Sequence, residues 1–405
     1  MGELVHRAGV GKSQVVSNGQ QLTSVPFGEE VPPLGTASLG QVFEGSAPDP
    51  LVVARYREGP VAVAVAGRFT NGTRLRRELQ VRGALFRSHS EAEVLAHLLA
   101  QSSQGTLVNR IVDALWRVEG AFSAVVMTPD RMVVVRDPHG IHTLVVGRIG
   151  EAWAVASEDS ALWATGGHSV RELARGELAI LKGKRCRSVR PFAARPMRSC
   201  AQNSVRLARE DARIMGREVY ALRRELGERL AADCPVPEDA VVVPLGAGAE
   251  SCALGFAGAA GCSYAPALRS EMQGWRVRAS AVEGRAVALV AMGVVTGADV
   301  RDATRLLRDV GCAEVHLRVA TPAVRQACIY GVTGPTHDQL AAPRATSEDE
   351  LAAGLGLDDI AGLSLDAMID VLGRDTDDSC QHCLACWNGA FPVVPEEPDD
   401  QLPLF

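Results

Sequence analysis

The stretch "DAVVVPLGAGAESCALGFAGAAG" (Asp239–Gly261) decides the fold of the second half of the chain. A short apolar run rich in valine is followed by a glycine-rich turn and then by a helical stretch of small residues. The run predicts a buried strand, and a turn and helix after it are typical of a βαβ unit. The same rhythm predicts further strands at 286–292 and 314–320 and helices at 217–233, 299–311, 346–355 and 364–373. We therefore expect an α/β domain whose parallel sheet is covered by helices.

The first part of the chain has a different pattern, with short alternating or apolar runs separated by turn residues. These runs predict strands at 59–67, 121–128, 131–137, 142–149 and 152–158 and helices at 90–102 and 107–118. The sequence thus predicts three parts: a β-rich domain at 1–185, an α/β domain at 186–375 and a cysteine-containing tail at 376–405.

The composition of the chain is that of a soluble globular protein. It has 405 residues, of which 47% are hydrophobic and 22% charged, and a formal net charge of −6. The acidic balance predicts no nucleic-acid partner. No apolar run is long enough for a membrane span and the N-terminus has no apolar signal core, so we expect a cytoplasmic protein with no membrane partner.

The segment "SCQHCLACWNGAFPV" (379–393) contains Cys380, Cys383 and Cys386 in two overlapping Cys-x-x-Cys pairs. Because no secretory signal is expected, closely spaced cysteines indicate metal ligands or redox groups rather than disulfides. This pattern alone leaves zinc, iron–sulfur and thiol redox chemistry open.

Several segments of the sequence resemble motifs of the amidophosphoribosyltransferase family, the first enzymes of de novo purine synthesis. They are "HRAGVGKSQVVSNGQQL", "FRSHSEAEVLAHLL", "RDPHGIHTLVVGR", "VRLAREDARIMGREVYALRRELGERLA" and "CLACWNGAFPV", which together span nearly the whole chain. The resemblance implies an α+β N-terminal-nucleophile glutaminase domain, an αββα sandwich, followed by a type I phosphoribosyltransferase domain. It also implies a homo-oligomer.

The residues that the family uses to hydrolyse glutamine are replaced. The family's N-terminal cysteine attacks the amide with its own amine as base, but removal of Met1 would expose Gly2 here. The positions that resemble the family's carboxylate-binding Arg, oxyanion Asn and amine-binding Asp hold Phe43, Ala66 and Glu91. We expect no glutaminase activity.

The residues that the family uses for phosphoribosyl transfer are also replaced. Ala291 and Met292 stand where the resemblance implies two Asp that bind the ribose diol, and Leu245 replaces the acid of the pyrophosphate loop. Only Gly297 of the second loop is kept. Apolar side chains bind neither a diol nor a magnesium pyrophosphate, so we expect no catalytic residue for the normal substrate. The glycine-rich turn "GAGAES" (246–251) leaves a small phosphorylated ligand as an alternative.

One further segment, "GVGKS" (9–13), ends like a phosphate-binding P-loop but lacks the first glycine and the preceding strand of that motif. We expect a plain loop at this position.

The family resemblance supplies partners for the tail cysteines. Many members hold a [4Fe–4S] cluster with four cysteines, and all four matching positions are occupied here, by Cys200, Cys328, Cys383 and Cys386. Four thiolates would complete one cubane, and a Cys₄ zinc site is the chemical alternative. Cys380 is left as a spare.

Two kinds of function follow from these observations. The first is a non-catalytic iron–sulfur pseudoenzyme with a regulatory, sensing or partner-subunit role, which forms a homo-oligomer or a mixed oligomer with a paralogue. The alternative is an amidophosphoribosyltransferase-type glycosyltransferase of purine biosynthesis, or a transferase acting on a different phosphorylated sugar.

Overall fold

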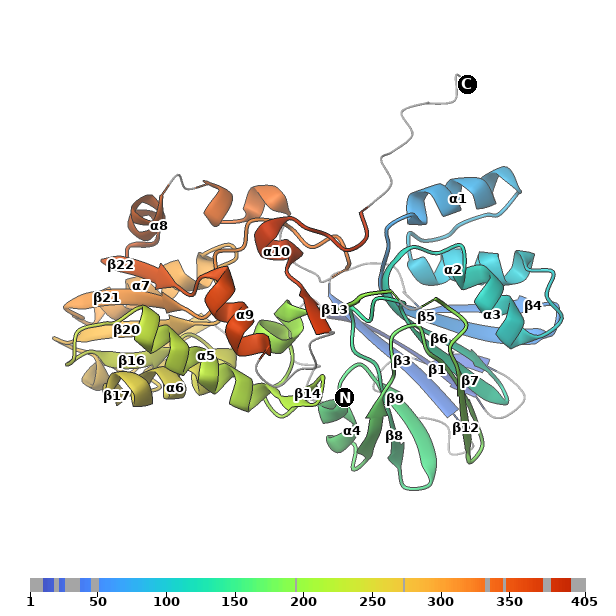
Figure 1. Ribbon diagram of the computed structural model, residues 1–405, viewed down its shortest axis with the longest axis horizontal. Helices are drawn as coiled ribbons and strands as arrows, with labels where there is room; N and C mark the ends of the chain where they lie inside the picture. Colours follow the sequence, from blue (N-terminus) through green and yellow to red (C-terminus); the bar gives the residue numbers. More distant parts are fainter. Residues whose placement is uncertain are drawn as a thin grey trace, which may run out of the picture. The chain divides into compact units, whose positions relative to one another are not determined.

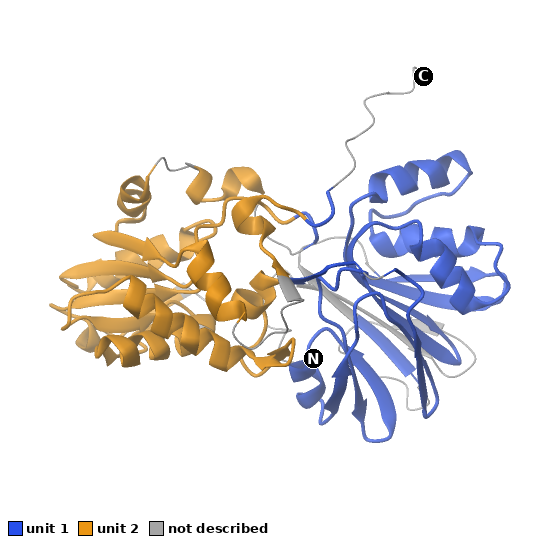
Figure 2. Ribbon diagram, in the orientation of Figure 1, with its two compact units in different colours: residues 1–199, 329–333, 392–405 blue, residues 200–328, 334–391 orange. Residues whose placement is uncertain are grey.

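The computed structural model describes residues 10–17, 22–25, 37–44, 51–193, 195–271, 274–331, 336–344, 347–373 and 380–394. The chain forms two compact units (Figure 2). The first comprises residues 1–199, 329–333 and 392–405, and the second comprises 200–328 and 334–391. The chain therefore passes from one unit to the other more than once. The division predicted at residues 185 and 375 stays a prediction, and much of the predicted tail, 374–379 and 395–405, lies outside the described residues.

The first unit is built on a six-stranded antiparallel sheet in the order β12-β11-β7-β6-β5-β4. Its strands are β4 (Val52–Tyr56), β5 (Gly59–Phe69), β6 (Gly120–Thr128), β7 (Arg131–Arg136), β11 (Leu178–Lys182) and β12 (Arg185–Val189). The predicted strands at 59–67, 121–128 and 131–137 are thus confirmed.

Helices cover one face of this sheet, and two smaller sheets cover the other. The helices are α1 (Gly72–Val81), α2 (Glu91–Gln101) and α3 (Leu107–Leu115), whose leucines pack on the valines of β5, β6 and β7. The smaller sheets are β1 (Val10–Ser17), β2 (Leu22–Val25) and β3 (Ala37–Glu44), and β8 (Val145–Ile149), β9 (Ala152–Ala156) and β10 (His168–Glu172). Helix α4 (Asp159–Trp163) packs on β8, β9 and β10, which completes a layered α-β-β-α arrangement (Figure 1).

The predicted loop at "GVGKS" is wrong, because its residues from Val10 onward belong to strand β1. An extended strand cannot wrap its N–H groups around a phosphate as a P-loop does.

The second unit is built on a five-stranded parallel sheet in the order β17-β16-β20-β21-β22. Its strands are β16 (Val241–Pro244), β17 (Ser263–Tyr264), β20 (Ala286–Ala291), β21 (Glu314–Val319) and β22 (Asp359–Gly362). One face packs against α5 (Val219–Asp233), α6 (Glu250–Ala260) and α9 (Leu365–Gly373), and the other against α7 (Ala298–Asp309) and α8 (Glu348–Leu355). Figure 1 shows α5, α6 and α9 along the sheet. The predicted α/β domain is confirmed.

Short elements complete the second unit and its borders. They are β13 (Met197–Cys200), a π-helical turn (Asn203–Leu207), β14 (Arg213–Ile214), β15 (Arg217–Glu218), the hairpin of β18 (Leu268–Glu271) and β19 (Gly274–Val277), β23 (Cys380–Cys383) and α10 (Ala385–Asn388). None of the helices in the described ranges is both long and apolar enough to cross a membrane.

Helices α5 and α6 cross with their backbones in direct contact. A Cβ at Gly227 of α5 would collide with the carbonyl oxygen of Cys252, and a Cβ at Gly255 of α6 would collide with that of Arg224. Each helix therefore presents a glycine to the other helix's backbone, so that no side chain separates them. A Cβ at Gly258, an exposed position of α6, would meet no atom within 4 Å.

We expect Gly227→Ala and Gly255→Ala each to lower the free energy of unfolding by about 2 kcal/mol or more, because the helices must move apart. Urea unfolding followed by circular dichroism measures this. The matched control Gly258→Ala should stabilise the protein by about 0.5 kcal/mol, since alanine is the better helix former. Equal changes in the free energy of unfolding for all three substitutions would contradict the close backbone contact between α5 and α6.

Candidate functional site

The four cysteines of the predicted cluster all belong to the second unit. Cys200 is the last residue of β13, Cys383 is the last residue of β23, and Cys386 lies in α10. Cys328 lies in the irregular segment that follows β21. Cys200 and Cys383 are buried and the other two are half-buried. Segments distant in sequence thus bring these cysteines into one unit, as a shared site requires.

Backbone hydrogen bonds fix the segment after β21 against the C-terminal turn. The carbonyl oxygen of Cys386 accepts the N–H groups of Arg325 at 2.9 Å and Gln326 at 3.0 Å. The indole N–H of Trp387 donates to the carbonyl oxygen of Pro322 at 3.0 Å. These contacts hold Cys328 and Cys386 on neighbouring stretches of backbone.

The thiols are close enough to affect one another's ionisation. Burial, together with the thiols of Cys383 and Cys328, raises the pKa of Cys200 to about 12, although the N–H groups of Asn203 and Gln202 act in the opposite direction. The pKa of Cys386 lies far above its usual range. The largest cause is a hydrogen bond with the Cys328 thiol, and the second largest is burial. Cys200 and Cys383 contribute to the same rise. The raised pKa values keep the Cys200 and Cys386 thiols protonated at neutral pH, and both thiols interact electrostatically with Cys328 and Cys383.

The spacing of these thiols is not that of ligands around a single ion. Among the described residues, no group of three or more His, Cys, Asp or Glu side chains is arranged to hold a metal ion. Tetrahedral zinc would need four sulfurs within about 4 Å of one another. A cubane binds each cysteine through a different iron and spaces them farther apart. The donor set, four largely buried thiols with N–H groups directed at Cys200, fits a cluster chemically. The side chain of Cys380 lies outside the described residues.

The positions predicted to have lost phosphoribosyl chemistry lie at the carboxyl end of the parallel sheet. Ala291 ends β20 with 2% exposure and packs in the core facing α7, while Met292 has 5% exposure and packs in the core facing α5 and α6. The last side chain of β20 and the one after it are therefore parts of the hydrophobic cores on the two faces of the sheet.

An aromatic side chain that the sequence does not single out covers the first of the two loops. Leu245 follows β16 and packs with Trp275 of β19 against the same core as Ala291. A Cβ at Gly246 would lie 3.6 Å from the Trp275 ring. The Trp275 ring thus lies against the glycine-rich turn. Gly297, with φ +74°, begins α7 as its N-cap.

The glutaminase positions lie in the first unit, on β3, β5 and α2. Gly67 has φ +105°, and a Cβ there would collide with the carbonyl oxygen of Ala121, so this glycine is required by the β5–β6 contact. Ala66 precedes it in β5, while Phe43 lies in β3 and its side chain is outside the described part of the chain. Glu91 begins α2, and its carboxylate accepts the N–H of Phe69 and lies 4.0 Å from the Arg68 guanidinium.

The comparisons with known proteins agree with this architecture. A family model described as a glutamine amidotransferase domain matches residues 42–164. The chain is 32% identical over 428 residues to the amidophosphoribosyltransferase of Bacillus subtilis (strain 168), covering 96% of this chain and 89% of that protein. It is 33% identical over 417 residues to the chloroplastic amidophosphoribosyltransferase 2 of Arabidopsis thaliana, covering 96% of this chain and 72% of that protein.

A solved structure matches residues of both units. It is the glutamine phosphoribosylpyrophosphate amidotransferase of Bacillus subtilis complexed with ADP and GMP, with a TM-score of 0.89 and 28% identity over 96% of this chain and 92% of that one. The first unit is thus an N-terminal-nucleophile glutamine amidotransferase domain and the second a type I phosphoribosyltransferase domain. The chain belongs to the amidophosphoribosyltransferase family.

Glu91 provides a pH-dependent test of the first unit. Burial raises its pKa from 4.5 to about 7, so the folded protein binds this proton more tightly than the unfolded chain. The resulting stability is fully present below pH 4.5 and is lost as the pH rises through 7. We expect Glu91→Gln to be more stable than the unchanged protein above pH 7, by at most about 3 kcal/mol, with little difference near pH 4.5.

Glu93, on the same first turn of α2 as Glu91, is the matched control of opposite sign. Burial raises its pKa, but hydrogen bonds from Arg87 and Ser88 outweigh burial and lower it. Glu93→Gln should therefore destabilise the protein at neutral pH. Unfolding midpoints of both variants across this pH range measure the contrast, and the same sign for both would contradict it.

Proposed function

We propose that this chain is a non-catalytic, iron–sulfur-binding member of the amidophosphoribosyltransferase family. The observation that carries the proposal is the gathering of Cys200, Cys328, Cys383 and Cys386 in one unit, with thiols that perturb one another's pKa. Thiols packed together in this way destabilise each other's charged form, and a bound cluster would offset that cost because its iron ions would take the place of the protons and neutralise the thiolates.

The burial of Ala291 and Met292 supports the absence of normal transferase chemistry. The substrate's ribose diol and magnesium pyrophosphate need anionic or polar ligands, whereas these two side chains are part of the hydrophobic cores. Trp275 against Gly246 adds an apolar cover to the turn that would bind pyrophosphate. In the first unit, Ala66 offers no side-chain donor to an oxyanion.

The cluster would supply a one-electron redox centre or a covalent link between distant segments. Either use accounts for keeping four cysteines on a scaffold that has lost its catalytic groups. The protein would act in a reducing, cytoplasmic environment as a sensing or regulatory subunit, either in a homo-oligomer or beside a catalytically complete paralogue.

Iron and sulfide analysis of anaerobically purified protein tests the cluster. We expect about four irons and four sulfides per chain, with broad visible absorption. Cys200→Ser, Cys328→Ser, Cys383→Ser and Cys386→Ser should each lower the iron content severalfold, because each removes the ligand of one iron.

Two cysteines elsewhere in the second unit serve as matched controls. Cys252 is fully buried, like Cys200, and Cys262 is half-buried, like Cys386. Cys252→Ser and Cys262→Ser should keep their iron. Iron-free, colourless protein would contradict the proposal, and about one zinc per chain without sulfide would assign the site to zinc.

Phosphoribosyl pyrophosphate with Mg²⁺ tests the transferase half. We expect it to leave the unfolding temperature unchanged, and no ammonia to form from glutamine. Ala291→Asp, which restores an acid of the family, should cost about 3 kcal/mol of stability, because the carboxylate enters a site with 2% exposure.

Ala298→Asp is the matched control, since Ala298 is exposed in the first turn of α7, where an acid favours the helix dipole. It should be neutral or slightly stabilising. A thermal shift with phosphoribosyl pyrophosphate would favour the amidophosphoribosyltransferase-type glycosyltransferase, and a shift with another sugar phosphate would favour a transferase of altered specificity.

A further inference from the structure

The second unit contains a pocket of about 540 Å³ at the carboxyl ends of β21 and β22, beside the start of α8 and α9. Its lining includes Val294 of the loop between β20 and α7, but no residue of the Leu245–Gly248 turn. A volume of this size suits a small organic ligand.

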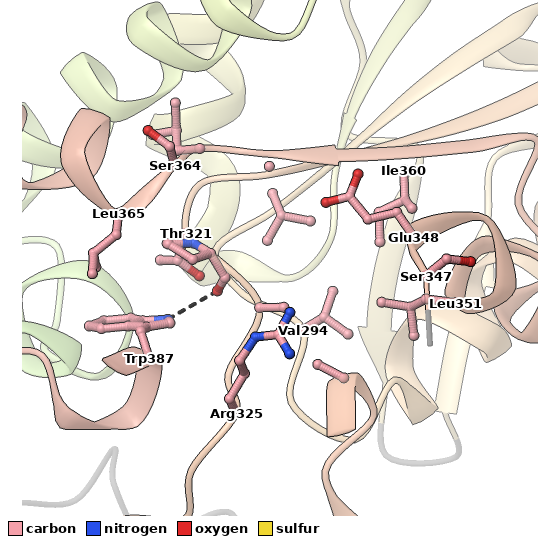
Figure 3. Close-up of a pocket in the computed structure, with 16 residues that line it drawn as sticks. Val294, Thr321, Arg325, Ser347, Glu348, Leu351, Ile360, Ser364, Leu365 and Trp387 are labelled. Atoms are coloured by element: carbon pink, nitrogen blue, oxygen red, sulfur yellow. Dashed lines mark hydrogen bonds between the residues drawn. The ribbon is translucent and has the colours of Figure 1, made fainter. Parts of the chain in front are cut away.

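The walls of the pocket are largely apolar. Trp387 and Leu365 line one side, and Leu351 and Ile360 line another (Figure 3). The Trp387 ring is held in place by the hydrogen bond from its indole N–H to the Pro322 carbonyl oxygen at 3.0 Å. A fixed aromatic wall favours a ligand with an apolar body.

Two opposite charges reach this apolar pocket from different elements. Arg325 comes from the segment after β21, and Glu348 is the first residue of α8 (Figure 3). Both side chains are exposed, and neither forms an ion pair with another described residue. The pocket therefore presents one cationic and one anionic group around an apolar surface.

A buried hydroxyl adds a third polar group to the lining. Thr321 has 2% exposure, and its Oγ1 has no hydrogen-bond partner among the described residues. The hydroxyls of Ser347 and Ser364, by contrast, already accept the N–H groups of Glu350 and Ala367 as helix caps. A polar ligand atom next to Thr321 would satisfy a group that is otherwise costly to bury.

We propose that this pocket binds a small zwitterion with an apolar body, its carboxylate toward Arg325 and its ammonium toward Glu348. A simple anion would meet the Glu348 carboxylate, and a simple cation would meet the guanidinium of Arg325. A molecule that carries both charges is attracted by both groups. Amino acids with an apolar side chain or an apolar main carbon chain are the class that fits.

Isothermal titration and thermal shift of the full chain test the pocket. The probes are the apolar α-amino acids and the linear ω-amino acids from glycine to 6-aminohexanoate, whose increasing length reports the separation of the two charges. We expect at least one of these zwitterions to bind and to change the tryptophan fluorescence, an effect lost in Trp387→Phe. Hexanoate and hexylamine, which each carry one charge, should bind about tenfold more weakly or not at all.

Charge-neutral variants separate specific from general effects. Arg325→Gln and Glu348→Gln should each weaken the best zwitterion about tenfold. Asp349→Asn, also exposed in the first turn of α8 but outside the pocket, and Arg305→Gln, exposed on α7, should leave binding unchanged. Circular dichroism and iron content of each variant show that fold and cluster are intact.

The outcomes are decisive in either direction. No binding by any zwitterion up to about 10 mM, or equal weakening in the control variants, would overturn the proposal. Equally tight binding of hexanoate or hexylamine would also overturn it, because only one charge would then be recognised. The test does not depend on the cluster, since binding is measured on protein of known iron content.

Discussion

Two hydrogen bonds to one carbonyl oxygen join the segments of the second unit that carry Cys328, Cys386 and the pocket. The Cys386 oxygen accepts the N–H groups of Arg325 and Gln326, which joins the C-terminal turn to the segment that leaves the sheet at β21. The cysteine site depends on this junction, because it brings Cys328 and Cys386 onto adjacent backbone. The pocket depends on it as well, since Arg325 and Trp387 line the pocket from the two joined segments.

The carboxyl end of β20 in the same unit carries apolar side chains rather than carboxylates. A site built from carboxylates carries a repulsion that bound Mg²⁺ must offset. With Ala291 and Met292 at the end of β20, that repulsion is absent and the cores on both faces of the sheet continue to the edge. The Trp275 ring packs beside Gly246 in the neighbouring turn. Apolar packing thus continues to this edge of the sheet.

Long periodic segments can be predicted from the sequence, because their burial pattern is local. The strand–turn–helix at Asp239–Gly261 appears as β16 and α6. Helix α1 is not predicted from the sequence, because most of its residues are charged or polar. Its buried residues are only its first glycine, Leu75 and Leu79. The prediction that the tail cysteines share one site with Cys200 and Cys328 depends on the family resemblance, because these residues are too far apart in the sequence to form a local motif. The positions of Trp275 and Trp387 depend on tertiary contacts and have no sequence signal.

The repeated passage of the chain between the units restricts how the protein can be divided. Tyr330 belongs to the first unit, where its hydroxyl accepts the N–H of Val393 at 2.7 Å and donates to the carbonyl oxygen of the same residue at 2.9 Å. A fragment that ended at residue 199 would lack this buried side chain and its partner. Neither unit corresponds to one uninterrupted stretch of the gene, so recombination at a single point could not have transferred either unit whole to another protein.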